Sequence, residues 1–119
     1  MREYYIKNIE EETRKNRNYR KVLYNNKDQQ IVLMSIKVGE EIGMERHDEV
    51  DQFIKIEEGE GIAIIREREY KLCKGSVVLI PRGFEHNIIN KGEEVMKLYS
   101  IYSPPEHRKN LINRTKPKK

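Results

Sequence analysis

The chain has 119 residues, of which 36% are hydrophobic and 37% are charged, and its formal net charge is +4. This length suits one domain with one core, and the apolar residues come in ordered runs, which excludes an intrinsically disordered chain. No apolar run approaches the ~20 residues of a membrane-spanning helix, and the charged N-terminus lacks the apolar centre of a signal peptide, so we expect a cytoplasmic protein with no membrane partner.

The positive charge is concentrated at the C-terminus. Residues 108–119 include six basic and no acidic residues, so the first 107 residues contain 18 basic and all 20 acidic residues. Such an end is more typical of a solvated tail than of a nucleic-acid-binding surface, and we do not expect a nucleic-acid partner. We therefore divide the chain into an N-terminal arm (1–18), a β-barrel domain (19–107) and a basic C-terminal tail (108–119).

Short strands separated by turn signals follow a charge-dense, asparagine-rich arm, for which we expect irregular structure or a short helical turn. The apolar run of residues 29–38 predicts a long strand covered on both faces. Residues 52–57 alternate, so polar Gln52 shares a face with Ile54 and Ile56. Because no segment has helical periodicity of useful length, the pattern indicates an all-β fold, a small antiparallel β-barrel or jelly roll. The expected strands are residues 20–24, 29–38, 52–57, 62–65, 70–72, 76–80, 85–90 and 95–102.

Two histidines far apart in the sequence, His47 and His86, lie on segments flanked by turns that can bring them together inside a barrel. Imidazole binds Zn, Fe, Ni and Cu, while the Gln52 carbonyl oxygen would add a neutral ligand suited to Mn or Fe. Glu45 could complete a two-histidine, one-carboxylate set with open positions, or it could point outward like Glu41. Gln52 could instead be a buried amide that bonds a ligand or a histidine ring.

The segment from Gly75 to Asn90 resembles the second signature motif of the cupin family at every defining position. Residues 39–59 are similar to the first cupin motif in spacing, although Glu45 occupies the place of its first histidine and Gln52 that of its glutamate. The matching positions are Gly75, Pro81, Gly83, His86 and Asn90 in one motif, and Gly39, His47 and Gly59 in the other.

The wider pattern, over about residues 19–107, is similar to a subgroup of small single-domain cupins labelled phosphomannose-isomerase-like. Its matching phrases include Asp51-Gln52-Phe53 and Tyr102-Ser103-Pro104-Pro105-Glu106-His107. The resemblance implies a barrel that holds one divalent metal ion (Mn, Fe, Zn or Ni) through His47, Gln52 and His86, with Glu45 as a further ligand. We expect His107 to be a rim or tail residue.

Two functions from different classes fit these residues. In the first, the chain is a metal-dependent enzyme on a small sugar-like or enediol-type substrate: an isomerase or epimerase with Glu45 as the catalytic base, or a dioxygenase if the metal is redox-active iron. In the second, the barrel binds a small ligand without catalysis, because the motif positions offer no second carboxylate and no lysine. We also expect a homodimer, since a small barrel leaves sheet edges and outer apolar faces, such as that carrying Leu33, uncovered.

Overall fold

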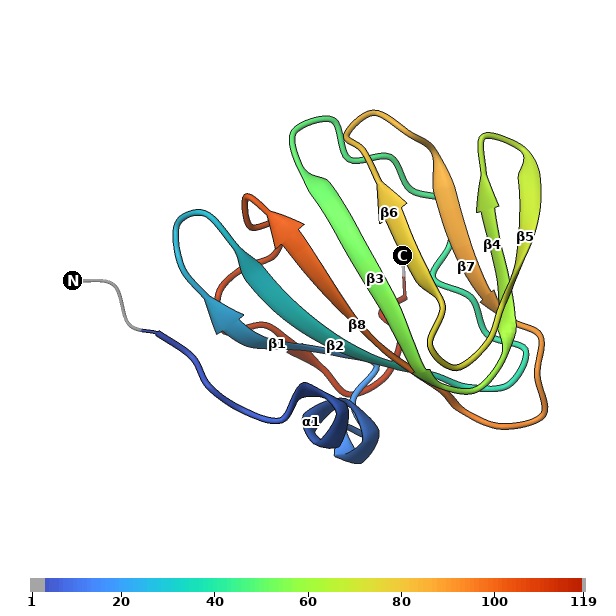
Figure 1. Ribbon diagram of the computed structural model, residues 1–119, viewed down its shortest axis with the longest axis horizontal. Helices are drawn as coiled ribbons and strands as arrows, with labels where there is room; N and C mark the ends of the chain where they lie inside the picture. The colour runs from blue at the N-terminus through green and yellow to red at the C-terminus, as the bar shows by residue number, and fades with distance from the viewer. Residues whose placement is uncertain (1–3, 119) are drawn as a thin grey trace.

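The computed structural model of the protein describes residues 4–118. It confirms the all-β prediction: two antiparallel sheets face each other, and a short helix lies at one end of them (Figure 1). Within the described residues the elements are α1 (Ile9–Lys15), β1 (Arg20–Asn25), β2 (Gln30–Ile36), β3 (Asp51–Glu58), β4 (Gly61–Ile65), β5 (Arg68–Leu72), β6 (Val77–Ile80), β7 (His86–Asn90), β8 (Met96–Ser103) and β9 (Ile112–Asn113).

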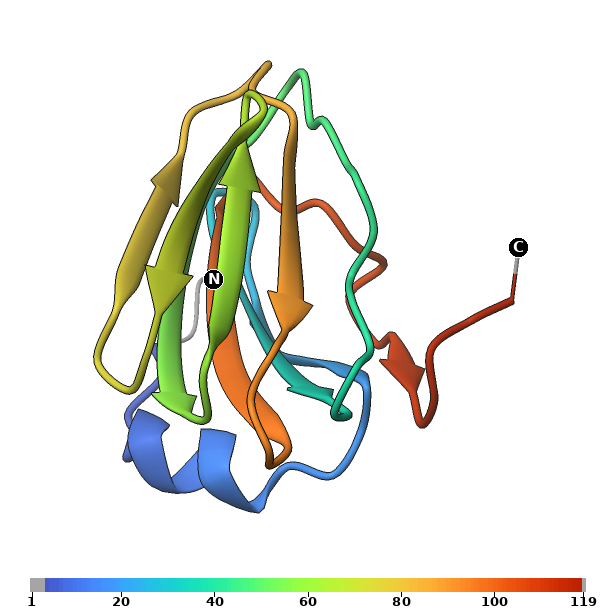
Figure 2. The ribbon, with the colours of Figure 1, turned by 90° about the vertical axis from the view of Figure 1, so that its right-hand side faces the viewer.

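The larger sheet has the strand order β6-β3-β8-β2-β1-β9, and the smaller sheet has the order β5-β4-β7. The two sheets stack as layers when the molecule is seen from the side (Figure 2). Alternation along β3 and β8 turns every second side chain inward, which buries Ile54, Ile56 and Leu98 completely. Ala63 and Ile88 from the smaller sheet close this core from the other side.

We expected the outer apolar face that carries Leu33 to be uncovered in a single chain. This expectation is wrong, because Leu33 is only 1% exposed. Leu33 lies in β2, which together with β3 and β8 is packed against α1. The charge-dense arm therefore contributes a helix that covers part of the outer sheet face. The large apolar residues that stay exposed on this sheet are in its two edge strands: Val77 and Leu79 in β6, and Ile112 in β9.

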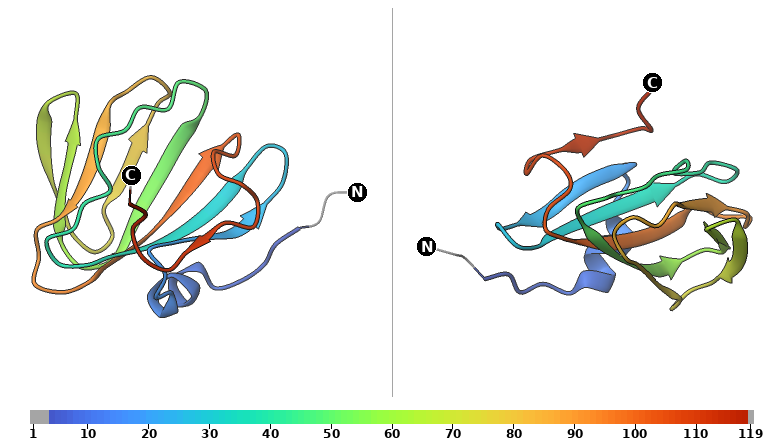
Figure 3. Two further views of the ribbon diagram at one scale, coloured as in Figure 1. Left: turned by 180° about the vertical axis from the view of Figure 1, so that it is seen from behind. Right: turned by 90° about the horizontal axis from the view of Figure 1, so that it is seen from above.

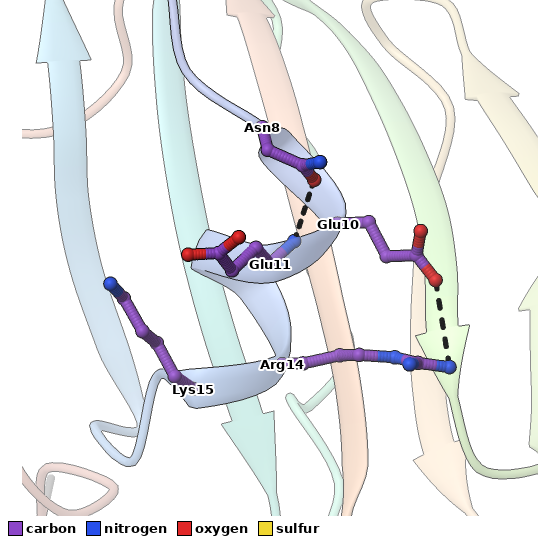
Figure 4. Close-up of a pocket in the computed structure, with 5 residues that line it drawn as sticks. All are labelled: Asn8, Glu10, Glu11, Arg14 and Lys15. Atoms are coloured by element: carbon purple, nitrogen blue, oxygen red, sulfur yellow. Dashed lines mark hydrogen bonds and ion pairs between the residues drawn. The ribbon is translucent and has the colours of Figure 1, made fainter.

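Local polar contacts explain why α1 forms in so polar a segment. The Asn8 side chain caps the helix by accepting a hydrogen bond from the Glu11 backbone N–H at 2.9 Å, and Arg14 pairs with Glu10 at 3.5 Å (Figure 4). Acidic residues in its first turn and basic residues in its last turn also match the helix dipole. No helix in the described part of the chain has the length and apolarity needed to cross a membrane.

Two further segments run over one side of the molecule, as the view from behind shows (Figure 3). The loop of residues 37–50 lies along β7 through isolated bridges at Glu41 and Glu45. The C-terminal segment adds β9 to the edge of β1, and Lys116 donates a hydrogen bond to the backbone oxygen of Glu41. Both segments thus contribute to the walls around the candidate site.

Candidate metal centre

Glu45 and His86 are neighbours because their backbones pair directly. The Glu45 N–H donates to the His86 oxygen at 2.8 Å, and the His86 N–H donates back to the Glu45 oxygen at 2.9 Å. Residues that exchange both hydrogen bonds in an antiparallel pair present their side chains to the same face. The Glu45 carboxylate consequently lies 3.9 Å from His86 Nε2, so it faces inward and does not point outward.

His47 joins this pair from the same loop. Its Nε2 lies 3.5 Å from Glu45 Oε1, and the rings of His47 and His86 are 5.4 Å apart between centroids. The donor atoms of the three side chains all lie within 4.8 Å of one another. The structure thus brings together Glu45, His47 and His86, although Glu45 and His86 are 41 positions apart in the sequence.

Hydrogen bonding prepares His86 to bind through Nε2. Its Nδ1 lies 3.0 Å from the Phe84 backbone oxygen, which requires the proton on Nδ1 and leaves the lone pair on Nε2. Burial lowers the pKa of His86 below its ordinary value, which favours the neutral ring that a metal ion needs. His86 is 2% exposed, so this ring is fixed inside the barrel.

A second carboxylate, Glu106, orients His47 from the other side. Glu106 Oε2 lies 3.4 Å from His47 Nδ1, the arrangement by which a carboxylate commonly positions a metal-binding imidazole. Contact with Glu45 raises the pKa of His47 above its ordinary value, and the Glu106 charge adds to this effect. Glu45 and Glu106 thus favour a positive charge on His47, and a metal ion between His47 Nε2 and Glu45 would supply that charge in place of the proton.

The Glu45 carboxyl is ionised near neutral pH. Burial raises its pKa, but the contact with His47 and the positive charges of His47, His86 and Arg20 together lower it below the ordinary value. Glu45 is therefore available as an anionic ligand or as a proton acceptor.

Gln52 enters the same neighbourhood from β3. Its Nε2 donates to Ser100 Oγ and to the Tyr102 hydroxyl, both at 3.1 Å, so its amide is bonded to β8 and not to a histidine ring. The Tyr102 ring in turn lies 5.8 Å from the His47 ring. These two bonds fix the amide so that its carbonyl oxygen Oε1 is the free end.

Buried polar atoms without hydrogen-bond partners also indicate that this donor set could hold a cation. His47 Nε2, His86 Nε2 and Gln52 Oε1 are all buried and lack a hydrogen-bond partner among residues 4–118. Buried polar atoms are rarely left without a partner, because each one costs about 1–3 kcal/mol. Two imidazole nitrogens, an amide oxygen and a carboxylate are a ligand set for a divalent ion such as Mn, Fe, Zn or Ni.

Three residues near the site were not expected from the sequence. Ser100 and Tyr102 could have been found from alternation, because they share the buried face of β8 with Leu98. The role of Glu106 could not be predicted from the sequence, where it stands out only as part of the Tyr102–His107 segment that resembles small cupins. His107 itself, expected at the rim, packs its ring edge-on against Tyr102 with 5.2 Å between centroids.

Comparison with known proteins identifies the family and supports the fold. Residues 32–102 match the family model described as "Cupin domain". The Bacillus subtilis protein YrkC, described as uncharacterized, is 39% identical over 94% of this chain, and the chain spans 63% of that protein's length. The protein L612 of Acanthamoeba polyphaga mimivirus, also described as uncharacterized, is 41% identical over 95% of the chain and 73% of its own length. The crystal structure of BH2720 from Bacillus halodurans superposes with a TM-score of 0.91 at 41% identity, covering 94% of this chain and 89% of that one.

Proposed function

This chain belongs to the cupin domain family, and we propose that it is a metal-dependent isomerase or epimerase acting on a small sugar-like or enediol-type molecule. The observation that carries the proposal is the cluster of Glu45, His47 and His86, whose donor atoms lie within 4.8 Å of one another. The sugar-like substrate is supported by the resemblance to the phosphomannose-isomerase-like subgroup of small cupins.

His47, His86 and Glu45 would hold the ion, and Gln52 Oε1 would be a fourth donor. A divalent cation in this set would supply Lewis-acid chemistry by polarising the oxygens of a bound substrate. Isomerisation also requires a base that removes a proton from the carbon beside a carbonyl group and returns it elsewhere. Glu45 is the proposed base, because its carboxyl is ionised and lies on the inner face beside both histidines.

The proposed base is tested by solvent exchange. Metal-loaded protein is incubated in D₂O with a panel of small hydroxyketones and hydroxyaldehydes, and NMR measures deuterium at the carbon beside the carbonyl. We expect exchange with the unchanged protein and its loss in Glu45→Gln, which keeps the volume of the side chain and removes the base. Metal content is measured on the same samples, so a lost base is distinguished from a lost ion.

The alternative of a non-catalytic binding module is favoured by one observation. Glu45 is the one carboxylate of the described residues within the three-residue donor cluster, and the second carboxylate nearby, Glu106, is engaged with His47 Nδ1 at 3.4 Å. Metal-loaded protein that binds members of the panel without any exchange would support this module and contradict the isomerase. Two histidines and one carboxylate also suit an iron oxygenase, and oxygen uptake by iron-loaded protein in the same panel tests that reaction.

We further propose that the protein forms a homodimer through the edge strand β6. Val77 and Leu79 in this strand are 50% and 68% exposed, and an exposed apolar edge strand is a template for pairing. Light scattering after size exclusion should give twice the 14.3 kDa chain mass. Leu79→Lys should shift the protein to the monomer, and a monomeric unchanged protein would contradict the proposal.

A further inference from the structure

A buried amide holds the segment that carries Glu106. Gln30 is the first residue of β2 and is fully buried. Its Oε1 accepts hydrogen bonds from the backbone N–H groups of Glu106 at 3.2 Å and His107 at 3.0 Å. Its Nε2 donates to the His107 backbone oxygen at 2.7 Å and to Asn25 Oδ1 at 2.8 Å. Both ends of the Gln30 amide therefore bond the backbone of the segment that follows β8.

This segment depends on Gln30 for its hydrogen bonds. It lies beyond the end of β8, and within residues 4–118 neither Glu106 nor His107 forms a hydrogen bond with another backbone group. The Gln30 amide instead bonds both the N–H and the oxygen of His107, as a residue of a neighbouring strand would do. Because Gln30 is fully buried, water does not readily replace it, so the position of the segment follows that of the amide.

Strand register places Gln30 in one row with two residues of the candidate site. Gln30 lies opposite Tyr102 in β8, and Tyr102 lies opposite Gln52 in β3. Residues directly opposite one another present their side chains to the same face of a sheet. Gln30 thus faces the inside of the barrel at the level of Gln52, whose Nε2 donates to the Tyr102 hydroxyl at 3.1 Å.

Glu106 connects the position of the segment to His47. Its Oε2 lies 3.4 Å from His47 Nδ1, and the other ring nitrogen of His47 lies 3.5 Å from Glu45 Oε1. The Glu106 side chain is 34% exposed, so burial alone does not fix it beside the ring. Its place there requires a fixed backbone, which the two hydrogen bonds to Gln30 Oε1 supply at Glu106 and at the next residue.

We propose that Gln30 is a positioning residue for the metal centre, because it holds Glu106 against His47 and thereby orients the His47 ring toward the ion. The inference rests on the proposed metal-dependent function and adds to it a residue of β2 that does not touch the donor atoms. It requires that Gln30 acts on metal binding through Glu106 and not through the overall stability of the barrel.

A double-mutant cycle tests this route. Zinc affinity is measured by competition with a metal indicator for the unchanged protein, Gln30→Met, Glu106→Ala and the double variant, at one pH and ionic strength. Met keeps nearly the volume of Gln and removes all four side-chain hydrogen bonds. We expect Gln30→Met to weaken zinc binding roughly tenfold, within the roughly 10–100-fold loss in Glu106→Ala, and to weaken it less than about twofold further when Glu106 is already replaced.

Two control variants separate positioning from stability. Ile36→Ala removes an equally buried side chain at the other end of β2, so it destabilises the core but should change zinc affinity less than about twofold. Gln30→Glu keeps an acceptor for the two backbone N–H groups and loses the Nε2 donor. It should therefore bind zinc more tightly than Gln30→Met, even if urea unfolding shows it to be the less stable of the two.

A second readout needs no metal. In metal-free protein, NMR at low temperature records the His47 Nδ1–H proton, assigned by its absence in His47→Gln. A hydrogen bond to the Glu106 carboxylate should protect this proton from exchange with water. We expect its signal in the unchanged protein and in Ile36→Ala, and its loss in Gln30→Met and Glu106→Ala.

The inference is overturned if Gln30→Met binds zinc as tightly as Ile36→Ala, or if its loss of affinity is as large in the Glu106→Ala background as in the unchanged protein. If Gln30→Met does not fold, Gln30→Asn, whose amide is one methylene further from the segment, replaces it in the same cycle. If the unchanged protein binds no zinc, the proposed function fails and the His47 signal decides alone. Its loss in Gln30→Met then supports the inference, whereas its persistence there, or its absence from the unchanged protein, overturns it.

Discussion

Glu106 offers the sharpest test of how the fold positions His47, a candidate metal ligand. Its Oε2 lies 3.4 Å from His47 Nδ1, and its side chain is 34% exposed. For unit charges at that separation, Coulomb's law gives about 1.2 kcal/mol in water and about 5 kcal/mol at an effective dielectric constant of 20. Because the carboxylate is about one-third exposed, the value lies toward the lower end, and we expect roughly 10–100-fold weaker metal binding in Glu106→Ala.

The assay is competition of chelator-treated protein with a calibrated metal indicator at fixed pH and ionic strength. Glu106→Gln keeps an acceptor for Nδ1–H without the charge, so its metal affinity should lie between those of Glu106→Ala and the unchanged protein. Glu49→Ala removes an exposed carboxylate from the loop of residues 37–50, which carries His47, and controls for the loss of one negative charge near the site. If Glu106→Ala and Glu49→Ala bind metal equally well, Glu106 does not position His47 and the reasoning is refuted.

Three further predictions concern stability and are measured by urea unfolding in the presence of a chelator. Glu67 has a φ of +73° in the β4–β5 turn, so Glu67→Gly should stabilise the protein by about 0.5–1 kcal/mol; a loss of stability would contradict strain there. A Cβ on Gly61 would lie 2.2 Å from the Ile89 backbone oxygen, so Gly61→Ala should lower the free energy of unfolding by more than about 2 kcal/mol. A Cβ on Gly39 would have nothing within 4 Å, so Gly39→Ala should cost only about 1 kcal/mol, because of the positive φ at that position. Equal losses of stability in the two variants would refute the packing argument. Burial lowers the pKa of His107 from 6.5 to about 4, so its stabilising contribution is complete above pH 6.5 and is lost as pH falls toward 4. Partial solvent screening reduces this loss to about 1–2 kcal/mol, and it should shrink in His107→Phe; an unchanged pH dependence in that variant would assign it to other groups.

The strands could be predicted because alternation is a local property. Gln52, Ile54 and Ile56 share one buried face of β3 as expected, and β2 is covered on both faces over its apolar stretch. The packing of α1 against β2, β3 and β8 was not predicted, because this helix is formed by a segment with few apolar residues.

The site was predictable only in part for a similar reason. His47, His86 and Gln52 could be proposed from spacing, but one sequence left two orientations for Glu45, and the backbone pair with His86 decides between them. Glu106 follows β8 and lies 3.4 Å from His47, which is 59 positions earlier in the chain. No local pattern predicts this contact, since it is a property of the closed fold.

The central claim is that His47, His86, Gln52 and Glu45 hold a divalent ion. The most direct measurement is calorimetric titration of chelator-treated protein with Mn²⁺, Fe²⁺ (under anaerobic conditions), Zn²⁺ and Ni²⁺, beside His86→Ala and His47→Ala. We predict that at least one of these ions binds the unchanged protein with a stoichiometry of about one per chain and that both variants lose this binding. A folded, unchanged protein that binds none of the four ions would contradict the account.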